Sequence, residues 1–300
     1  MSSPIKSNLQ NTRKAIQPFI ESALIDGVGL GHSSTLYGSV KSYQKLDEPA
    51  IVSSLFQYSL PEIQRVLNFY LNQTGVTAQI QGHFCHQRPI VTWNGAKKNP
   101  ELGDLFVVHM HYDDNLSVYM NSLLLQAKVS SAKGDTTNVG KGDQHQLHLY
   151  EKWPKFDYAK PQKIVGRDVT PKKAFDGAQY LLLHGNLKQY CTHQINGFKN
   201  NTSFNIAQAS GSLKIDNPLS KALLDFLSGD TGQQFYDTKH PKYSEWCKVC
   251  WDLLLDDSSY NATKVNRINE PRLLNFKLSA LPISTVIIQT GLINLPQQFD

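Results

Sequence analysis

Two short stretches of the sequence carry side chains suited to hydrolytic chemistry. "ELGD" contains the carboxylates Glu101 and Asp104, and "LLLQAK" ends in the amide Gln126 and the ammonium Lys128. Carboxylate and amide oxygens suit Mg²⁺, which lowers the pKa of a bound water from about 15.7 towards neutrality. A lysine beside them can orient that water and offset charge on a phosphate. These residue types are typical of metal-assisted phosphodiester hydrolysis.

A pair of neighbouring strands would have to position these groups. Residues 103–112 and 117–129 have strand character and only "DDNLS" joins them, so we expect them to pair in antiparallel fashion. Alternate side chains of a strand share a face, which places Gln126 and Lys128 together. The beginning of the first strand and the end of the second then meet at one edge of the sheet, beside Asp104.

The surrounding pattern predicts an α/β fold with a mixed sheet. Residues 59–75 predict a helix with Ser59 as N-cap, Pro61 in its first turn and Gly75 as terminator. The stretch 26–40 is rich in Gly and Ser and predicts a loop rather than a phosphate-binding turn. Further strands are expected at 76–86, 177–185, 203–210 and 284–291, and further helices at 9–25, with Pro18 as a kink or restart, 144–154, 217–229 and 243–255.

This order suggests three parts and a mainly helical C-terminal portion. The parts are an N-terminal helix and loop (1–54), an α/β core (55–215) and a helical C-terminal subdomain (216–300). No internal repeat or low-complexity tract interrupts them. The C-terminal portion could hold a partner, a second protomer or the substrate.

Composition fits an ordinary globular protein in the cytoplasm. The 300 residues are 40% hydrophobic and 18% charged, with a net charge of +5 and a pI near 8.8. Modest positive charge permits a polyanion partner. No stretch approaches a membrane span, and the first residues contain no apolar signal core, so we expect no membrane association. Four scattered cysteines do not form a disulfide framework, and "CKVC" (247–250) predicts buried thiols in a helix rather than a zinc site.

The stretches "ELGD" and "LLLQAK" resemble the motif of the PD-(D/E)xK nuclease superfamily, which has the restriction-endonuclease-like fold. That pattern has a helix, three strands with Asp in the second and (D/E)-x-K in the third, and then another helix. Over residues 55–190, Glu62 matches the acidic residue that many members carry on the first helix. Gln146 and Tyr150 match the Q-x-x-x-Y of RecB-like members. There these two residues lie beside the site and contact metal-bound water or the DNA backbone.

The resemblance implies a Mg²⁺-dependent nuclease acting on DNA, with Mn²⁺ as a possible substitute. Asp104 would be a metal ligand, Gln126 a weaker ligand or water-positioning group, and Lys128 the residue that orients the nucleophile. Glu62 and Glu101 compete for the second carboxylate role. The resemblance further implies a bacterial restriction or anti-phage role, with repair as the runner-up, and a homo-oligomer or a defence-system partner protein.

One departure from the pattern opens an alternative. Gln126 stands where the family usually carries a carboxylate, although active members with Q-x-K exist. The chain could therefore be a catalytically silent module that binds nucleic acid or a partner protein. Glu62 also suits a capping box with Ser59, and Gln146 and Tyr150 also suit an ordinary helix.

Two structural explanations compete for the remaining residues of the motif. Glu101 and Asp104 are also ordinary turn residues after Pro100, and Gln126 and Lys128 also suit the solvated end of an edge strand.

A different metal site is the competing interpretation of "HMHYDD". His109, His111 and Asp113 would share one strand face, and His184 follows downstream. This stretch resembles the H-x-H-x-D-H loop of metallo-β-lactamase-fold hydrolases, which bind Zn²⁺. Asp114 replaces the last His of that loop, and the other metal-binding loops of that fold are missing.

Overall fold

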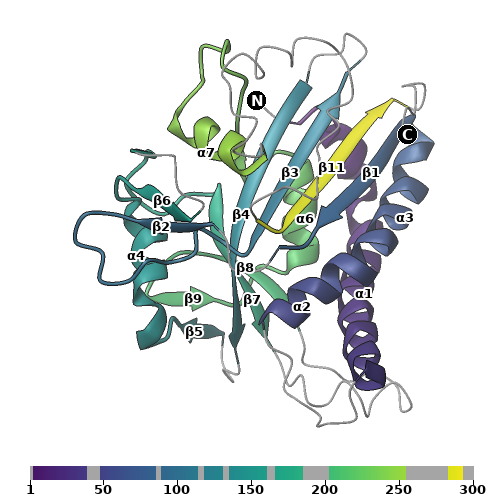
Figure 1. The fold of residues 1–300 in the computed structure, drawn as a ribbon. Coiled ribbons are helices and arrows are strands. Elements are labelled where there is room, and N and C mark those ends of the chain that lie inside the picture. Colours follow the sequence, from purple (N-terminus) through teal and green to yellow (C-terminus); the bar gives the residue numbers. More distant parts are fainter. Residues whose placement is uncertain are drawn as a thin grey trace.

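A seven-stranded mixed sheet forms the centre of the computed structural model (Figure 1). The structure describes residues 3–38, 48–85, 89–113, 118–130, 135–160, 166–184, 203–254 and 283–292. The strands follow the order β1, β11, β3, β4, β7, β8, and β10 pairs with the first half of β4. They are β1 (Val76–His83), β3 (Leu105–Tyr112), β4 (Val118–Ser130), β7 (Ala178–His184), β8 (Ser203–Gln208), β10 (Gln233–Gln234) and β11 (Thr285–Leu292).

Helices cover both faces of this sheet. One face packs against α1 (Lys6–Gly38), α2 (Glu48–Ser54), α3 (Leu60–Leu71) and α6 (Leu219–Leu227). The other face packs against α4 (Gln144–Lys152) and α7 (Glu245–Leu254), with the small pair β2 (Ile90–Thr92) and β6 (Asp157–Lys160) beside them. A second pair, β5 (Thr136–Asn138) and β9 (Ser212–Lys214), lies outside the central sheet. The α/β class predicted from the sequence is confirmed.

The strands that carry the motif pair as predicted. β3 and β4 are antiparallel, with Leu105 opposite Leu125, and the chain then passes through α4 to β7, which runs parallel to β4. Along β4 the odd-numbered Leu123 and Leu125 enter the core under α1 and α6, whereas Leu124 enters the core under α4. Gln126 continues the even-numbered row, so it faces the α4 side of the sheet.

The N-terminal helix is longer than predicted. Residues 26–38 continue α1 instead of forming a loop, and Pro18 lies within the helix. The buried positions Ile16, Ile20, Leu24 and Val28 repeat every four residues and extend the apolar face through this stretch. Gly27 serves close packing, because a Cβ there would lie 2.0 Å from the Ser59 Oγ atom.

The helical run around α3 also begins earlier than predicted. A π-helical turn (Leu55–Ser59) joins α2 to α3, so Ser59 has helical torsions and makes no side-chain capping bond. Ser59 as the N-cap is therefore wrong, and with it the capping box. Gly75 ends the run as predicted, at φ 78° in the left-handed region, after a 3₁₀ turn (Asn72–Thr74).

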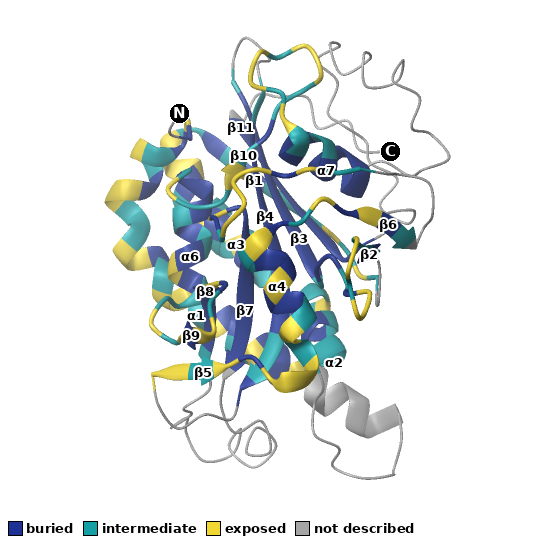
Figure 2. Cartoon of the chain, turned by 90° about the vertical axis from the view of Figure 1, so that its left-hand side faces the viewer, coloured by how far each residue is buried: buried dark blue, intermediate teal, exposed yellow. Residues whose placement is uncertain are grey.

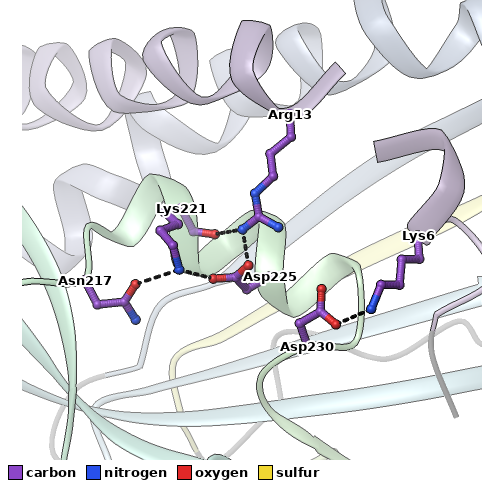
Figure 3. A network of polar contacts seen from close by, with 6 residues as sticks. All are labelled: Lys6, Arg13, Asn217, Lys221, Asp225 and Asp230. Carbon is purple, nitrogen blue, oxygen red and sulfur yellow. Dashed lines mark hydrogen bonds and ion pairs between the residues drawn. The ribbon is translucent and has the colours of Figure 1, made fainter. Parts of the chain in front are cut away.

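The C-terminal portion contributes to the central sheet. β11 lies between β1 and β3, antiparallel to the first and parallel to the second, so the portion predicted as mainly helical supplies a central strand. Its helix α6 is held to α1 by an ion pair in which Asp225 accepts from Arg13 (Figure 3). Asp225 also accepts from Lys221, one turn earlier on α6, at 2.7 Å. Lys6 pairs with Asp230 in the same way at 2.5 Å.

Among the described residues, none of the helices has both the length and the apolar character needed to span a membrane.

Candidate active site

A polar pocket opens at the edge of the sheet where β3 begins and β4 ends. Its volume is about 220 Å³. Residues of α4 and α2 both line it. Helix α2 lies near the end of β4 (Figure 1). The residues that line it are Glu48, Pro49, Val52, Phe84, Cys85, Glu101, Gly103, Asp104, Gln126, Ala127, Lys128, Gln146 and Ser284.

Asp104 is fixed to β4 by backbone and side-chain hydrogen bonds. Its N–H donates to the Leu125 carbonyl at 2.9 Å, and its Oδ2 atom accepts from the Ala127 N–H at 2.7 Å and from the Gln126 side-chain amide. These bonds hold the carboxylate beside the last residues of β4. Asp104 therefore lies close to Gln126 and Lys128, as predicted from the antiparallel pairing of the two strands.

A second carboxylate lies against Asp104. Glu101 forms an isolated bridge with Ile90 at the base of the loop that follows β2, and its side chain is close enough to share a proton with Asp104. Burial raises the pKa of Asp104 well above its usual value, and the hydrogen bond and negative charge of Glu101 raise it further. The Ala127 N–H and the Lys128 charge act in the opposite direction. Two acids that compete for one proton are poised to accept a cation.

Lys128 lies between two further acids. Its Nζ atom is 3.8 Å from Glu48 Oε2 and 3.4 Å from Asp143 Oδ2, and its side chain is only 17% exposed. Glu48 also accepts the Val129 N–H at 3.1 Å, which ties the first turn of α2 to the end of β4. The ammonium is therefore held at the pocket wall by charges on both sides.

Two amide oxygens at the pocket wall are buried. Gln126 and Gln146 are 1% and 9% exposed, and neither Oε1 atom has a hydrogen-bond partner. Buried polar atoms are normally paired, so these two oxygens beside two carboxylates could accept a hydrogen bond or contact a cation. In the described part of the chain no three His, Cys, Asp or Glu side chains form a metal-binding group. An ion here would therefore be bound by carboxylate and amide oxygens, which suits hard cations.

The Q-x-x-x-Y residues lie at different depths. Gln146 reaches the pocket, whereas Tyr150 lies beneath it and donates its hydroxyl to the Leu102 carbonyl at 2.9 Å. Gly103 allows the backbone to pack closely against Leu124 and Tyr150, because a Cβ there would lie 2.7 Å from Leu124 Cδ1 and 3.1 Å from the Tyr150 hydroxyl. Tyr150 thus supports the backbone that presents Asp104.

Glu62 does not reach the pocket, and Glu48 does. Glu62 lies on α3, whose buried residues Ile63 and Leu67 face the other side of the sheet, and it pairs with the exposed Arg65. Sequence reasoning missed Glu48 because the start of α3 was placed at Ser59. The available signal was an acidic residue three positions before the apolar pair Ile51 and Val52, which marks the true start of the helical run.

The histidines of "HMHYDD" lie on the opposite face from Gln126. The Thr290 Oγ1 atom lies 2.9 Å from His109 Nε2 and 2.9 Å from His111 Nδ1, beneath α6. Backbone pairing places His184 beside Ser130 and His109 beside Asn121, nine residues apart along β4, or about 30 Å. The Zn²⁺ site that combines His184 with these histidines is therefore wrong, and Asp114 lies outside the described residues.

The cysteines of α7 are buried thiols, as predicted. Cys247 and Cys250 are fully buried, and the Cys250 thiol donates to the Ser122 hydroxyl at 3.3 Å. Burial raises the pKa of Cys250 well above its usual value, which keeps it in the unreactive thiol form. Cys85 is half-buried and lines the pocket, and Cys191 lies outside the described residues.

Comparison of the chain with family models, curated proteins and solved structures found no match.

Proposed function

We propose that this protein is a metal-dependent nuclease that hydrolyses phosphodiester bonds of DNA. The observation that carries the proposal is the pairing of two adjoining carboxylates, Asp104 and Glu101, with the orphaned amide oxygens of Gln126 and Gln146. Lys128 lies in the same pocket. This combination of acidic, amide and cationic groups fits metal-assisted phosphodiester hydrolysis better than it fits a hydrophobic core or the solvated end of a strand.

Asp104, Glu101 and Gln126 are the residues that would hold Mg²⁺ or Mn²⁺, with Gln146 in reach through a water. The bound ion supplies Lewis acidity at the phosphate and a water of lowered pKa. Asp104 stays fixed by the Ala127 N–H, so its second oxygen keeps a constant direction towards the pocket. Preorganised ligands of this kind need little rearrangement when a substrate binds.

Lys128 is the residue that would act on the nucleophile and the phosphate. Burial of its side chain between Glu48 and Asp143 holds its charge in one place. An ammonium so placed can orient an attacking water and offset the charge that develops on the phosphate oxygens. Gln146 of α4 lines the same pocket, and its Oε1 atom can accept a hydrogen bond from the same water.

The order of elements supports the same proposal. Helix α3, strands β1, β3 and β4, helix α4 and strand β7 follow the series of the PD-(D/E)xK superfamily, with β11 and the small strand β2 as additions. Glu48, on α2 directly before the helical run of α3, lies beside the site, where the resemblance suggested the acidic residue Glu62.

A specific observation favours a catalytically silent module as the second candidate. The Gln126 amide already binds Asp104, and Lys128 already lies between two acids, so the pocket charges are balanced without an ion. A site that lost its metal would retain this kind of internal pairing. Such a module would still bind nucleic acid or a protein partner.

Cleavage of plasmid and linear DNA with Mg²⁺, Mn²⁺ or a chelator separates the two candidates. We expect metal-dependent cleavage that Asp104→Asn abolishes and Lys128→Ala slows by about 10²–10³-fold. The exposed Asp168–Lys172 ion pair supplies matched controls, Asp168→Asn and Lys172→Ala, which should cleave like the wild type. Binding without cleavage in any metal would support the silent module instead.

A further inference from the structure

A row of basic side chains runs along the exposed face of α4, next to the pocket. Lys141 in the preceding 3₁₀ turn (Lys141–Asp143), followed by His145, His148 and Lys152, is spaced by four, three and four residues. That spacing puts all four on one side of the helix. We call this row the α4 stripe. Figure 2 shows α4 on the viewer's side of the molecule, with exposed residues outward and β2 beside it.

An aromatic pair joins the α4 stripe to the loop after β2. The rings of Trp93 and His148 stack with centroids 5.7 Å apart and planes at 24°. Trp93 is half-buried against the core under α4, whereas His148 is exposed. The imidazole therefore forms the outer member of a stack whose inner member is anchored in the protein.

Backbone bonds connect this loop rigidly to the pocket. The Trp93 carbonyl accepts the Ala96 N–H at 3.0 Å in a turn that Gly95 permits with φ 84°. At the base, the Val91 N–H donates to the Pro100 carbonyl at 2.9 Å, one residue before Glu101. The loop thus links the ring pair at one end to a pocket carboxylate at the other.

His145 lies between two lysines, one on the loop and one in the pocket. Burial lowers the pKa of His145, Asp143 raises it, and the charges of Lys98 and Lys128 lower it again. His145 therefore lies near both the exposed Lys98 of the loop and the pocket lysine. Its neighbour Gln146 lines the pocket itself. A negatively charged chain could follow this path from the ring pair to Asp104.

We infer that the α4 stripe and the Trp93–His148 pair bind a single-stranded segment of DNA and lead it into the pocket. The identity of this ligand rests on the proposed nuclease function. An unpaired base would stack on His148, and Lys98 and Lys141 would contact the phosphates on either side. Stacking on aromatic rings beside a basic groove is the usual way to bind single strands without sequence preference.

The geometry favours a single strand over a duplex. Bases inside a duplex already stack on one another, so they cannot extend an aromatic stack without leaving the helix. The loop that carries Trp93 ends at Glu101 in a pocket of only about 220 Å³, which suits one strand rather than the width of a double helix. The substrate class of the site would then be single-stranded DNA or a single-stranded end or flap.

Binding can be measured without cleavage. Fluorescence anisotropy with a labelled 20-nucleotide strand, in chelator and in an Asp104→Asn background, reports affinity alone. We expect tighter binding of the strand than of the same sequence as a duplex, and a loss of roughly 5- to 100-fold in His148→Ala. His148→Tyr, which keeps a ring, should restore most of the affinity. Lys98→Ala should reduce the salt slope of log K by about 0.7.

Matched controls lie on the α1–α3 side of the sheet. Phe69 is an aromatic residue with 66% exposure and Lys14 an exposed lysine, so Phe69→Ala and Lys14→Ala remove the same groups from elsewhere. They should leave the affinity unchanged. Trp93→Phe keeps a ring beneath His148 and should retain most of the affinity for the strand. Trp93→Ala removes the ring and should lower the affinity, provided that thermal unfolding shows that the variant folds.

Failure of this inference is distinguishable from failure of the proposed function. Equal affinity for strand and duplex, or equal binding by His148→Ala and Phe69→Ala, overturns the inference even if the wild type cleaves DNA. Strand binding that depends on His148 supports it, and an absence of cleavage in that case removes only the nuclease proposal.

Discussion

Replacing Gln126 with glutamate tests whether the amide faces the carboxylate pair. Gln126→Glu removes the amide donor to Asp104 Oδ2, a bond to a charged group worth about 1.5–3 kcal/mol. It also adds a third acid to a pocket in which Glu101 already lies against Asp104 and raises the pKa of Asp104. Two anions about 4 Å apart repel by about 4 kcal/mol at an effective dielectric constant of 20, and protonation relieves part of this.

Without metal we therefore expect Gln126→Glu to lower the free energy of unfolding by about 2–4 kcal/mol, or the melting temperature by about 3–6 °C. With Mg²⁺ or Mn²⁺ the sign should reverse, because a third carboxylate strengthens a hard-cation site. Ion binding at 100 times the dissociation constant adds about 2.7 kcal/mol to the stability. Thermal unfolding with chelator and with increasing metal measures both effects.

Gln179→Glu is the matched control for this experiment. Gln179 is also buried in the central sheet, but its amide donates to the Asp176 carbonyl at 3.0 Å and the Thr231 hydroxyl at 3.2 Å. A carboxylate there should destabilise the fold without any recovery in metal. Equal metal responses of the two variants, or an undisturbed melting temperature in Gln126→Glu, would refute the assignment of Gln126 to a cation site.

Three other perturbations have defined outcomes. Glu48→Gln should slow DNA cleavage by about 10–100-fold, as loss of an orienting partner does, while Glu62→Gln cleaves normally; equal rates would contradict the placement of Glu48 at the site. Gly103→Ala should cost about 1–3 kcal/mol in urea unfolding, because its Cβ would overlap Leu124. Burial, followed by the charge of His111, lowers the pKa of His109 to about 3, so the unfolded chain binds a proton first as the pH falls. Stability should thus fall by about 1.4 kcal/mol per unit between pH 6.5 and about 3, a slope that His109→Gln should remove when unfolding is measured at pH 7 and 5.

Local periodicity was sufficient to place most elements of the fold. Pro61 in the first turn indicated α3, and Gly75 indicated its end. The same reasoning failed at Gly27, where a glycine typical of loops instead allows α1 to pack against Ser59. Such a contact joins residues 32 positions apart, and no local pattern reports it.

The order of the strands in the sheet could not be predicted from the sequence for a similar reason. The apolar run 284–291 was correctly predicted as a strand, but nothing local indicates that β11 lies between β1 and β3. Its position depends on which neighbours bury Ile287 and Ile288 on both faces, a tertiary choice. A strand buried on both faces looks the same in sequence wherever it lies in the sheet.

The site was predictable where it depended on a short connection. Only five residues join β3 to β4, which fixes the register that brings Asp104 beside Gln126. Glu48 comes from a segment whose helix boundary was misplaced, and Glu101 reaches Asp104 through the bridge to Ile90. Groups delivered by long-range packing were therefore the ones that sequence reasoning missed or left undecided.

The arrangement around Lys128 bears on whether the pocket is active. Its distances of 3.8 Å to Glu48 and 3.4 Å to Asp143 exceed those of good hydrogen bonds, so the acids attract the ammonium without fixing its donors. Donors held loosely by charge can turn to a water or a phosphate oxygen at little cost. In contrast, the Oδ2 atom of Asp104 accepts two hydrogen bonds from β4, and the same carboxyl group also hydrogen-bonds with Glu101. Two acids against each other beside amide oxygens without partners destabilise the fold unless a proton or a cation binds there, and this cost is the reason that we propose a cation site.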